Sequence, residues 1–238
     1  MLKALLDILF PPLCHGCKAF IPSAGELHLC PACRAGSPVI ASPLCPVCGG
    51  PFLTEGGIDH RCGSCIDEPP PFAAARAAVQ FDGPVRNLIH TFKYHKQVRH
   101  CRPLALLVAE ELREFAVASA ADIIIPVPLH VKRLRERSFN QAILLGEVLA
   151  RKWRLPLSRS NLCRIRWTEP QINLKAEERR ENVRGAFAVK FPAAVRGLRV
   201  ILVDDVYTTG STVAECARTL KKAGAEAVFV VTVARAAR

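Results

Sequence analysis

The sequence has no apolar run of the roughly 18 residues that a bilayer span requires. Its candidate apolar segments, such as residues 200–203 and 228–233, have the length of strands. Compositional bias is also lacking, since half of the residues are hydrophobic and 23% are charged, with 18 Pro and 14 Gly. This balance excludes a disordered chain, a collagen-like repeat and a rod of heptads. We therefore expect a soluble protein with a buried core.

The first ten residues do not have the features of a secretory signal peptide. Asp7 interrupts their apolar stretch, and Pro11 and Pro12 follow it where a small-residue cleavage site would stand. We interpret residues 1–10 as a short amphipathic helix that packs on the body of the protein, with contact to a membrane as the alternative. A cytoplasmic location is expected, with the inner face of the membrane as the alternative.

Acidic side chains are scarce in most of the chain. Residues 1–71 have a net charge of −2 and residues 72–238 one of +14, and residues 132–184 hold 14 basic and six acidic side chains. Such a basic stretch suits a phosphate-rich ligand or nucleic acid. The alternative is a solvated surface that only aids solubility, which the charge alone explains equally well. Aromatic residues make up only 6%. Candidates for base stacking in the basic stretch are Phe139, Trp153 and Trp167, and core burial is the alternative for both tryptophans.

Cysteine is abundant, and eight of the 11 cysteines form four Cys-x-x-Cys pairs, namely Cys14/Cys17, Cys30/Cys33, Cys45/Cys48 and Cys62/Cys65. Two such pairs supply the four thiolates of a closed structural zinc site, so the pattern predicts two zinc ions. We favour sequential pairing, with 12 and 13 residues between the pairs, and interleaved pairing stays open. A thioredoxin-like site needs one such pair, and a disulfide framework needs an oxidising compartment.

The remaining cysteines and the nearby histidines have simpler interpretations. We expect Cys101, Cys163 and Cys216 to pack in the core, and His15, His28 and His60 to face solvent rather than bind metal. With about 70 residues and few large apolar side chains, the cysteine-rich region depends on zinc to fold. An acidic, proline-rich linker at residues 67–71 separates it from the rest. We predict a double zinc ribbon at residues 1–71 and a second domain at residues 72–238.

The second domain alternates strand and helix patterns. Strands are predicted at residues 75–82, 122–127, 199–204 and 226–233, and helices at residues 84–94, 103–118, 139–152 and 211–223, with Gly224 ending the last helix. This alternation predicts an α/β fold with a mostly parallel sheet flanked by helices. Ligands of such sheets bind beyond the carboxyl ends of the strands.

The segment at residues 199–212, RVILVDDVYTTGST, lies at one of those strand ends. Asp204 and Asp205 can accept hydrogen bonds from the vicinal hydroxyls of a ribose. The residues after them, Thr208, Thr209, Gly210, Ser211 and Thr212, offer hydroxyls and backbone N–H groups to a phosphate at a helix N-terminus. No Gly-Lys-Ser/Thr sequence of a Walker loop is present. The segment therefore predicts a ribose 5-phosphate site, and an ordinary helix cap with solvated aspartates is the alternative.

This segment resembles the motif of type I phosphoribosyltransferases that binds phosphoribosyl pyrophosphate (PRPP). Further matches resemble the ComF family of competence proteins: residues 92–94, residues 125–130, Arg133, Arg137, residues 139–142, Thr168, Gln171, Arg179, Asn182, Gly185 and Phe187. The resemblance implies a type I phosphoribosyltransferase fold behind an amino-terminal double zinc ribbon. It also implies PRPP binding with Mg²⁺, a role in DNA uptake or processing, and single-stranded DNA and DNA-uptake or recombination proteins as partners.

The resemblance assigns roles to individual residues. It places Val127, Pro128, Leu129 and His130 at the pyrophosphate, and Arg133 and Arg137 beside Asp204 and Asp205 at the reaction centre. Residues 168–184 take the place of the flexible hood, and Ser138 stands where the family commonly has Gly. No base-recognition element is evident, so the acceptor stays open, as does the oligomeric state. An active phosphoribosyltransferase of nucleotide salvage is the first alternative, and a PRPP-sensing regulator is a further one.

Overall fold

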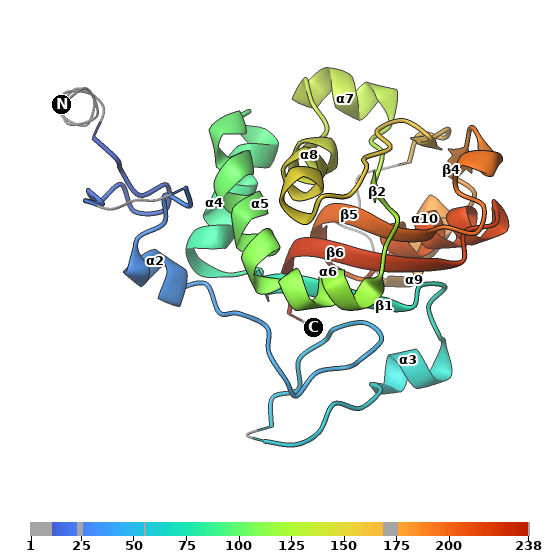
Figure 1. Cartoon of the computed structure of the whole chain (residues 1–238), viewed down its shortest axis with the longest axis horizontal. Helices are drawn as coiled ribbons and strands as arrows, with labels where there is room; N and C mark the ends of the chain where they lie inside the picture. Colours follow the sequence, from blue (N-terminus) through green and yellow to red (C-terminus); the bar gives the residue numbers. More distant parts are fainter. Residues whose placement is uncertain (1–10, 23–25, 55, 169–175, 238) are drawn as a thin grey trace.

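The computed structural model describes residues 11–22, 26–54, 56–168 and 176–237 (Figure 1). The helix predicted at residues 1–10 lies outside the described residues. A four-stranded sheet forms the centre, with the strand order β1-β6-β5-β2. Its strands are β1 (Ala74–Gln80), β2 (Ile123–Pro126), β5 (Arg199–Tyr207) and β6 (Ala227–Arg235), and every neighbouring pair is parallel. The predicted mostly parallel α/β sheet is confirmed.

The two central strands, β5 and β6, are apolar along most of their length. Val200, Ile201, Leu202 and Val203 of β5 are each at most 1% exposed. A strand covered by helices on both faces has no solvent side, so its sequence is a continuous apolar run rather than an alternating one. The run in β5 ends at Asp204, and polar residues therefore begin at the carboxyl edge of the sheet.

Helices cover both faces of the sheet (Figure 1). On one face lie α4 (Gly83–Tyr94), α5 (Cys101–Glu111) and α8 (Gln141–Trp153). On the other face lies α10 (Ser211–Lys222), beside α9 (Ala176–Val183). A two-stranded antiparallel sheet of β3 (Leu162–Arg164) and β4 (Phe187–Val189) lies on the same face. Each layer encloses its own apolar core. Gly224, with a φ of +98°, follows the last turn of α10 as predicted.

The helix predicted at residues 103–118 is two helices in the structure. It divides into α5 and α6 (Arg113–Ser119) at Leu112, whose φ of −108° interrupts the helical conformation. Leu112 and Ala116 are both buried, so the apolar recurrence continues across the break and predicts a single helix. The sequence-based prediction has no counterpart of the helices α7 (Val131–Arg137) and α9 or of the two-stranded sheet of β3 and β4.

Two cysteine-rich segments attach to this body, the first ribbon (residues 11–36) and the second ribbon (residues 38–68). Their short helices are α2 (Pro31–Ala35) and α3 (Gly63–Asp67), and the 3₁₀ turns η1 (Val98–His100) and η3 (Pro192–Ala194) lie in the body. The first ribbon lies beside α4 and α5. Its Arg34 forms ion pairs with Glu110 and Glu111 at 3.0 and 2.9 Å, and its Glu26 contacts Arg102 and Lys152.

The second ribbon covers the outer edge of β1. The backbone N–H of Ala75 donates to the Val47 carbonyl at 2.7 Å, and that of Gln80 donates to the Pro38 carbonyl at 2.8 Å. An antiparallel bridge joins Val39 to Val79 between these two bonds. The opposite edge strand, β2, is bonded along its free side to residues 156–158 through Ile124. Both edge strands of the sheet are therefore hydrogen-bonded to segments that are not themselves strands.

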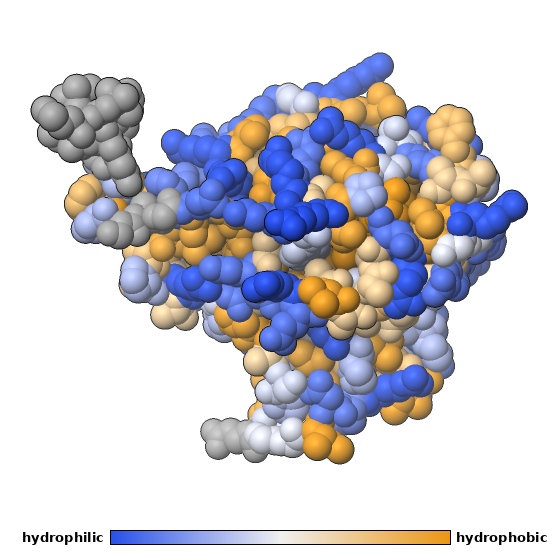
Figure 2. All heavy atoms as spheres, viewed as in Figure 1, coloured by the Kyte–Doolittle hydropathy of each residue, from blue (hydrophilic) through white to orange (hydrophobic). Residues whose placement is uncertain are grey.

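The outer part of the second ribbon contributes little to the core. Leu53 is fully exposed and Ile58 is mostly exposed, and hydrophobic side chains appear at the lower end of the molecule in Figure 2. Elsewhere on this face, hydrophilic and hydrophobic side chains are interspersed (Figure 2). Among the helices that the structure describes, none has both the length and the apolar character needed to cross a bilayer.

Candidate functional site

A pocket of about 370 Å³ opens at the carboxyl ends of β2 and β5, the edge where a parallel sheet binds its ligands. Its walls come from β5, the loop before α10, the loop after β2, α4, α7, α8 and β3. The lining residues are Phe81, Lys93, Tyr94, Val127, Pro128, Leu129, His130, Arg133, Arg137, Asn140, Gln141, Ala142, Arg164, Trp167, Thr168, Asp204, Asp205, Val206, Tyr207, Thr208, Gly210, Ser211, Thr212 and Val213. Every residue predicted to bind PRPP is in this set except Thr209.

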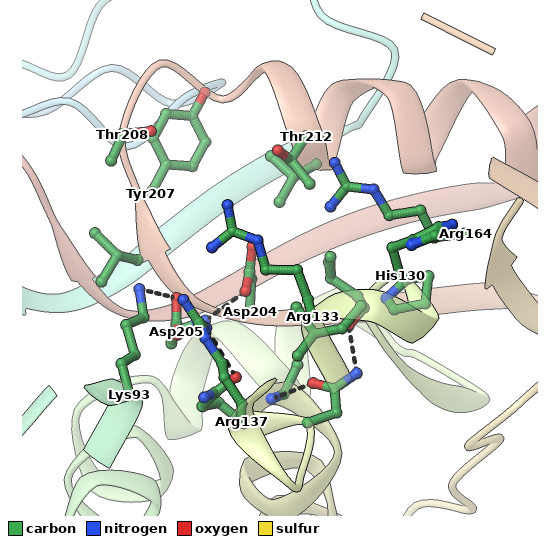
Figure 3. Close-up of a pocket in the computed structure, with 18 of the residues that line it drawn as sticks. Lys93, His130, Arg133, Arg137, Arg164, Asp204, Asp205, Tyr207, Thr208 and Thr212 are labelled. Carbon is green, nitrogen blue, oxygen red and sulfur yellow. Dashed lines mark hydrogen bonds and ion pairs between the residues drawn. The ribbon is translucent and has the colours of Figure 1, made fainter. Parts of the chain in front are cut away.

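The acidic pair stands at the end of β5 (Figure 3). Asp205 is 7% exposed, and its carboxylate accepts from Lys93 Nζ at 2.8 Å. The backbone N–H of Asp205 donates to Asp204 Oδ1 at 2.8 Å. Asp204 keeps one side open to the pocket, but the surrounding protein and the charge of Asp205 raise its pKa to about 7, while Lys93 opposes that rise. The pair is thus held beside the cation Lys93, and a further cation or hydrogen-bond donor in the pocket would favour the ionised form of Asp204.

Lys93 is a site residue to which the sequence analysis assigned no role. It lies in the last turn of α4, more than one hundred residues before the aspartates, and reaches them because α4 packs across the end of the sheet. Its only signal in the sequence is its place in the Phe-Lys-Tyr segment that resembles the ComF family.

The loop between β5 and α10 presents hydroxyls and backbone N–H groups to the pocket. Gly210 has a φ of +81°, and a Cβ atom there would lie 2.3 Å from the Tyr207 hydroxyl oxygen, so only glycine fits. Thr208, Ser211 and Thr212 line the pocket, at the N-terminus of α10 where the helix dipole favours an anion.

Thr209 lies on the other side of this loop. Its Oγ1 is 2.9 Å from Ser211 Oγ and accepts from the Ser211 N–H at 3.4 Å. It lines a neighbouring groove of about 610 Å³, between the second ribbon, α9 and α10. The Thr209 hydroxyl therefore orders the turn at the start of α10.

The opposite wall of the pocket is basic. His130 caps α7 by accepting from the Lys132 N–H at 3.3 Å, and Arg133 and Arg137 project from α7 into the pocket (Figure 3). Asn140 fixes the loop of residues 127–130, because its amide nitrogen donates to the Val127 carbonyl at 3.0 Å and its oxygen caps α8. The structure thus brings the predicted pyrophosphate loop and both arginines to the pocket that holds the aspartates.

Two further polar side chains of the lining have unpaired atoms. Arg164 Nε and Gln141 Nε2 are buried and have no hydrogen-bond partner among the described residues. Arg164 also donates to Thr168 Oγ1 and lies over the Phe187 ring. Leaving a buried donor unpaired is costly, so these two atoms are exceptions among the polar side chains of the lining. Gln141 belongs to the segment that resembles ComF, whereas nothing in the sequence singled out Arg164.

Ser138, which stands in place of the family's Gly, has a φ of +71° as the residue that ends α7. Its Oγ accepts from Lys96 Nζ at 3.0 Å. The left-handed conformation costs a non-glycine residue roughly 1–2 kcal/mol. The substitution therefore places a strained residue directly after the helix that carries Arg133 and Arg137.

The three candidate stacking residues differ in position. Trp167 lines the pocket, with its ring 5.3 Å from that of His130 and with Lys132 and Arg133 near its face. Trp153 packs against the core and Phe139 stacks on Phe92. In the predicted hood, Thr168 lines the pocket and α9 packs on α10, while residues 169–175 lie outside the described part of the chain.

The cysteine pairs group sequentially. Cys14, Cys17, Cys30 and Cys33 form one tetrad and Cys45, Cys48, Cys62 and Cys65 the other, each with its sulfurs within 4.8 Å of one another. The Sγ atoms of Cys17 and Cys30 are 3.6 Å apart, and those of Cys48 and Cys62 are 3.7 Å apart. Zinc–sulfur bonds of about 2.3 Å in a tetrahedron place the sulfurs roughly 3.8 Å apart. Both tetrads therefore fit a zinc ion.

One prediction about the histidines is wrong. His60 is exposed, but His15 and His28 are half-buried, because the His15 ring packs against the rings of His28 and His100 at 5.6 and 5.3 Å. No histidine joins either tetrad in the described part of the chain. Cys101 and Cys216 are buried as predicted, and Cys163 is half-buried.

Comparisons with known proteins match two parts of the chain to two different family models. A family model described as a double zinc ribbon domain matches residues 5–66, and one described as a phosphoribosyl transferase domain matches residues 171–238. DNA utilization protein YhgH of Salmonella typhi is 34% identical over 92% of this chain and 95% of that protein. Competence protein F of Haemophilus influenzae is 33% identical over 89% of this chain and 94% of that protein. Competence protein ComFC of Bacillus subtilis is 28% identical over 82% of this chain and 79% of that protein.

Proposed function

Because the chain belongs to the ComF family of competence proteins, we propose that it binds PRPP with Mg²⁺ in the pocket at the end of β5 and acts in DNA uptake or processing. The observation that carries the PRPP proposal is the convergence of three chemically distinct groups in one pocket. An acidic pair, a helix N-terminus rich in hydroxyls and two arginines all face the same 370 Å³ space.

Each group matches one part of PRPP. The loop of residues 208–212 and the N-terminus of α10 offer N–H and O–H donors to the 5-phosphate. Asp204 and Asp205 accept hydrogen bonds from the ribose hydroxyls. The loop of residues 127–130, with Arg133 and Arg137, faces the pyrophosphate. Mg²⁺, when bound with PRPP, supplies positive charge against the pyrophosphate oxygens, and Asp204 and Asp205 are the carboxylates placed to hold it.

The surface around α7 supports binding of single-stranded DNA. Lys132 and Arg135 are exposed on this helix, and Arg133 lies near the face of Trp167 at the pocket. Tyr94, half exposed, lies under Arg137. Cations beside aromatic rings are what a sequence-tolerant single-strand site uses, and affinity at such a site falls steeply with salt. DNA-uptake or recombination proteins are the partners that such a role implies.

The cysteine tetrads support two structural zinc ions. Each tetrad uses four thiolates and so leaves no position open for a reacting group. We assign the ions a folding role, since the ribbons bury little apolar surface of their own.

Titration calorimetry with PRPP and MgCl₂ tests the proposed site. Wild-type protein should bind, and Asp205→Ala should weaken binding at least tenfold, because the ribose hydroxyls and Mg²⁺ then lose a carboxylate acceptor. Glu114→Ala makes the same charge change at an exposed position on α6 and should leave affinity unaltered. Equal affinity for wild type and Asp205→Ala would refute the site.

A transfer assay with the wild-type protein distinguishes the two candidate functions, DNA uptake and nucleotide salvage. Labelled PRPP incubated with nucleobases and amines should show no transfer if the pocket serves DNA uptake. Release of pyrophosphate with one of these acceptors would instead favour a phosphoribosyltransferase of nucleotide salvage.

A further inference from the structure

Arg235, at the end of β6, is a buried cation whose partners lie in two different parts of the molecule. It is 4% exposed, and no carboxylate in the described part of the chain lies within 4.0 Å of its guanidinium. Its Nη1 donates to the Cys48 carbonyl at 2.7 Å, and its Nη2 lies 3.6 Å from Cys48 Sγ. A buried guanidinium needs such acceptors, because burial without them costs several kcal/mol.

The other partner is an aromatic ring just before the loop of residues 208–212, called the phosphate loop below. The guanidinium carbon lies 4.3 Å from the centre of the Tyr207 ring. Tyr207 and Arg235 are paired in register on β5 and β6, and the Ala236 N–H donates to the Tyr207 carbonyl at 2.9 Å. The two side chains are therefore held against each other by the central strands.

Tyr207 in turn supports the loop. It is 5% exposed, and the backbone of Gly210 lies so close to it that a Cβ atom would be 2.3 Å from the hydroxyl oxygen. On its far side, the guanidinium is covered by the ribbon, since a Cβ on Gly50 would lie 3.2 Å from Arg235 Nη2. Ribbon, guanidinium, ring and loop thus form one continuous packed row.

Charge gives this row a dependence on the metal. A tetrad of four thiolates around Zn²⁺ has a net charge of about −2 and is the anion that Arg235 otherwise lacks. In the described part of the chain, the first ribbon is tied by the ion pairs of Arg34 and Glu26 to α5 and α8 instead.

We propose that Arg235 is a positioning residue through which the second ribbon orders the phosphate loop of residues 208–212. This inference rests on the proposed PRPP site. Arg235 does not itself line the pocket, and it acts through Tyr207, which stands between it and the loop. The role is therefore to hold the loop in its binding conformation before the ligand arrives.

Arg76 provides a matched control. It also donates to the second ribbon, through Nη1 to the Pro46 carbonyl at 3.0 Å, and it also lies over a ring, that of Phe115. Its hydrogen bonds go to the Pro46 and Ala75 carbonyls and its ring contact is with Phe115, so these anchors are separate from the row. Arg76→Met and Arg235→Met each remove one arginine anchor of the same ribbon, and only the second interrupts the row.

The experiment measures amide hydrogen exchange of residues 208–212 in the zinc-loaded, ligand-free variants, together with PRPP affinity by calorimetry. Arg235→Met should speed exchange of these amides and weaken PRPP binding about tenfold, within the range typical of coupled sites, with zinc content unaltered. Arg76→Met should leave both unaltered. Arg235→Lys, which keeps the charge but lacks a flat guanidinium, should fall between, and it stands in for Arg235→Met if that variant does not fold.

The outcomes separate the two proposals. Faster loop exchange in Arg235→Met alone, with no PRPP binding even in wild type, would refute the PRPP site and support the positioning role. PRPP binding in wild type, with loop exchange that is the same in Arg235→Met and Arg76→Met, would overturn the positioning role and leave the site.

Discussion

Asp204 is the residue whose charge we expect to set stability and ligand affinity in opposite directions. Its pKa rises from an ordinary value of 3.8 to about 7 in the folded protein, through burial and the neighbouring Asp205. The native state therefore keeps a proton that the unfolded chain releases, and stability falls as the pH rises from about 4 to about 7. PRPP and Mg²⁺ need the carboxylate, so their affinity should increase over the same range.

Asp204→Asn removes this dependence. The variant should unfold at a higher temperature than wild type at pH 8, and the difference should shrink at pH 5.5, where wild-type Asp204 is mostly protonated. One kcal/mol corresponds to roughly 2–4 °C in a chain of this size, so the difference at pH 8 should reach several degrees. Thermal unfolding at both pH values measures it, with Glu114→Gln as the control. A difference of the same size at both pH values would contradict the assigned protonation.

Individual site residues were predictable where they are close together in sequence. Asp204, Asp205 and the loop of residues 208–212 occur in one segment whose chemistry can be recognised without the fold. Lys93, Arg164 and Arg235 come from three distant elements and reach the site or its supports through packing and strand register. Lys93 belongs to a segment that resembles the ComF family, but no local pattern assigns a role to any of the three.

Among the elements, α7 was missed for a physical reason. None of its residues is buried, so it has no apolar periodicity by which a helix could be predicted. The long strands and the helices α4, α8 and α10 were predicted because each buries a regular apolar face. This unpredicted helix projects basic side chains away from the core.

We expect α7 to contact DNA through Arg135, which is exposed and does not line the pocket. Arg135→Gln should weaken binding of a single-stranded oligonucleotide and reduce the slope of log affinity against log salt by about 0.7, the value for one lost phosphate contact. PRPP affinity should stay unaltered. Fluorescence anisotropy over a series of salt concentrations measures the slope.

Arg113→Gln is the control for this experiment, because it removes an exposed arginine from α6. An equal loss of DNA affinity in both variants would indicate a diffuse effect of net charge, and α7 would then have no special part in binding.

At the scale of the whole molecule, the two tetrads predict a zinc content of two ions per chain. Cys17→Ser should reduce this content to one, because it removes a ligand of the first tetrad only. Cys216→Ser should retain both ions, since Cys216 lies on the buried face of α10 and belongs to neither tetrad. Metal analysis of protein purified under reducing conditions checks all three values. One ion in wild type, or two in Cys17→Ser, would contradict the assignment.

The pairing of β1 with the second ribbon has a consequence for self-association. An uncovered edge strand presents a row of free N–H and C=O groups that can pair with a second chain. Here residues 38–47 occupy that row on β1, and residues 156–158 occupy the corresponding row on β2. Only the cover on β1 belongs to a segment that folds around a metal. Removal of zinc should therefore release a template for intermolecular β-pairing, and light scattering after chelation should report growing assemblies from a protein whose central sheet is still intact.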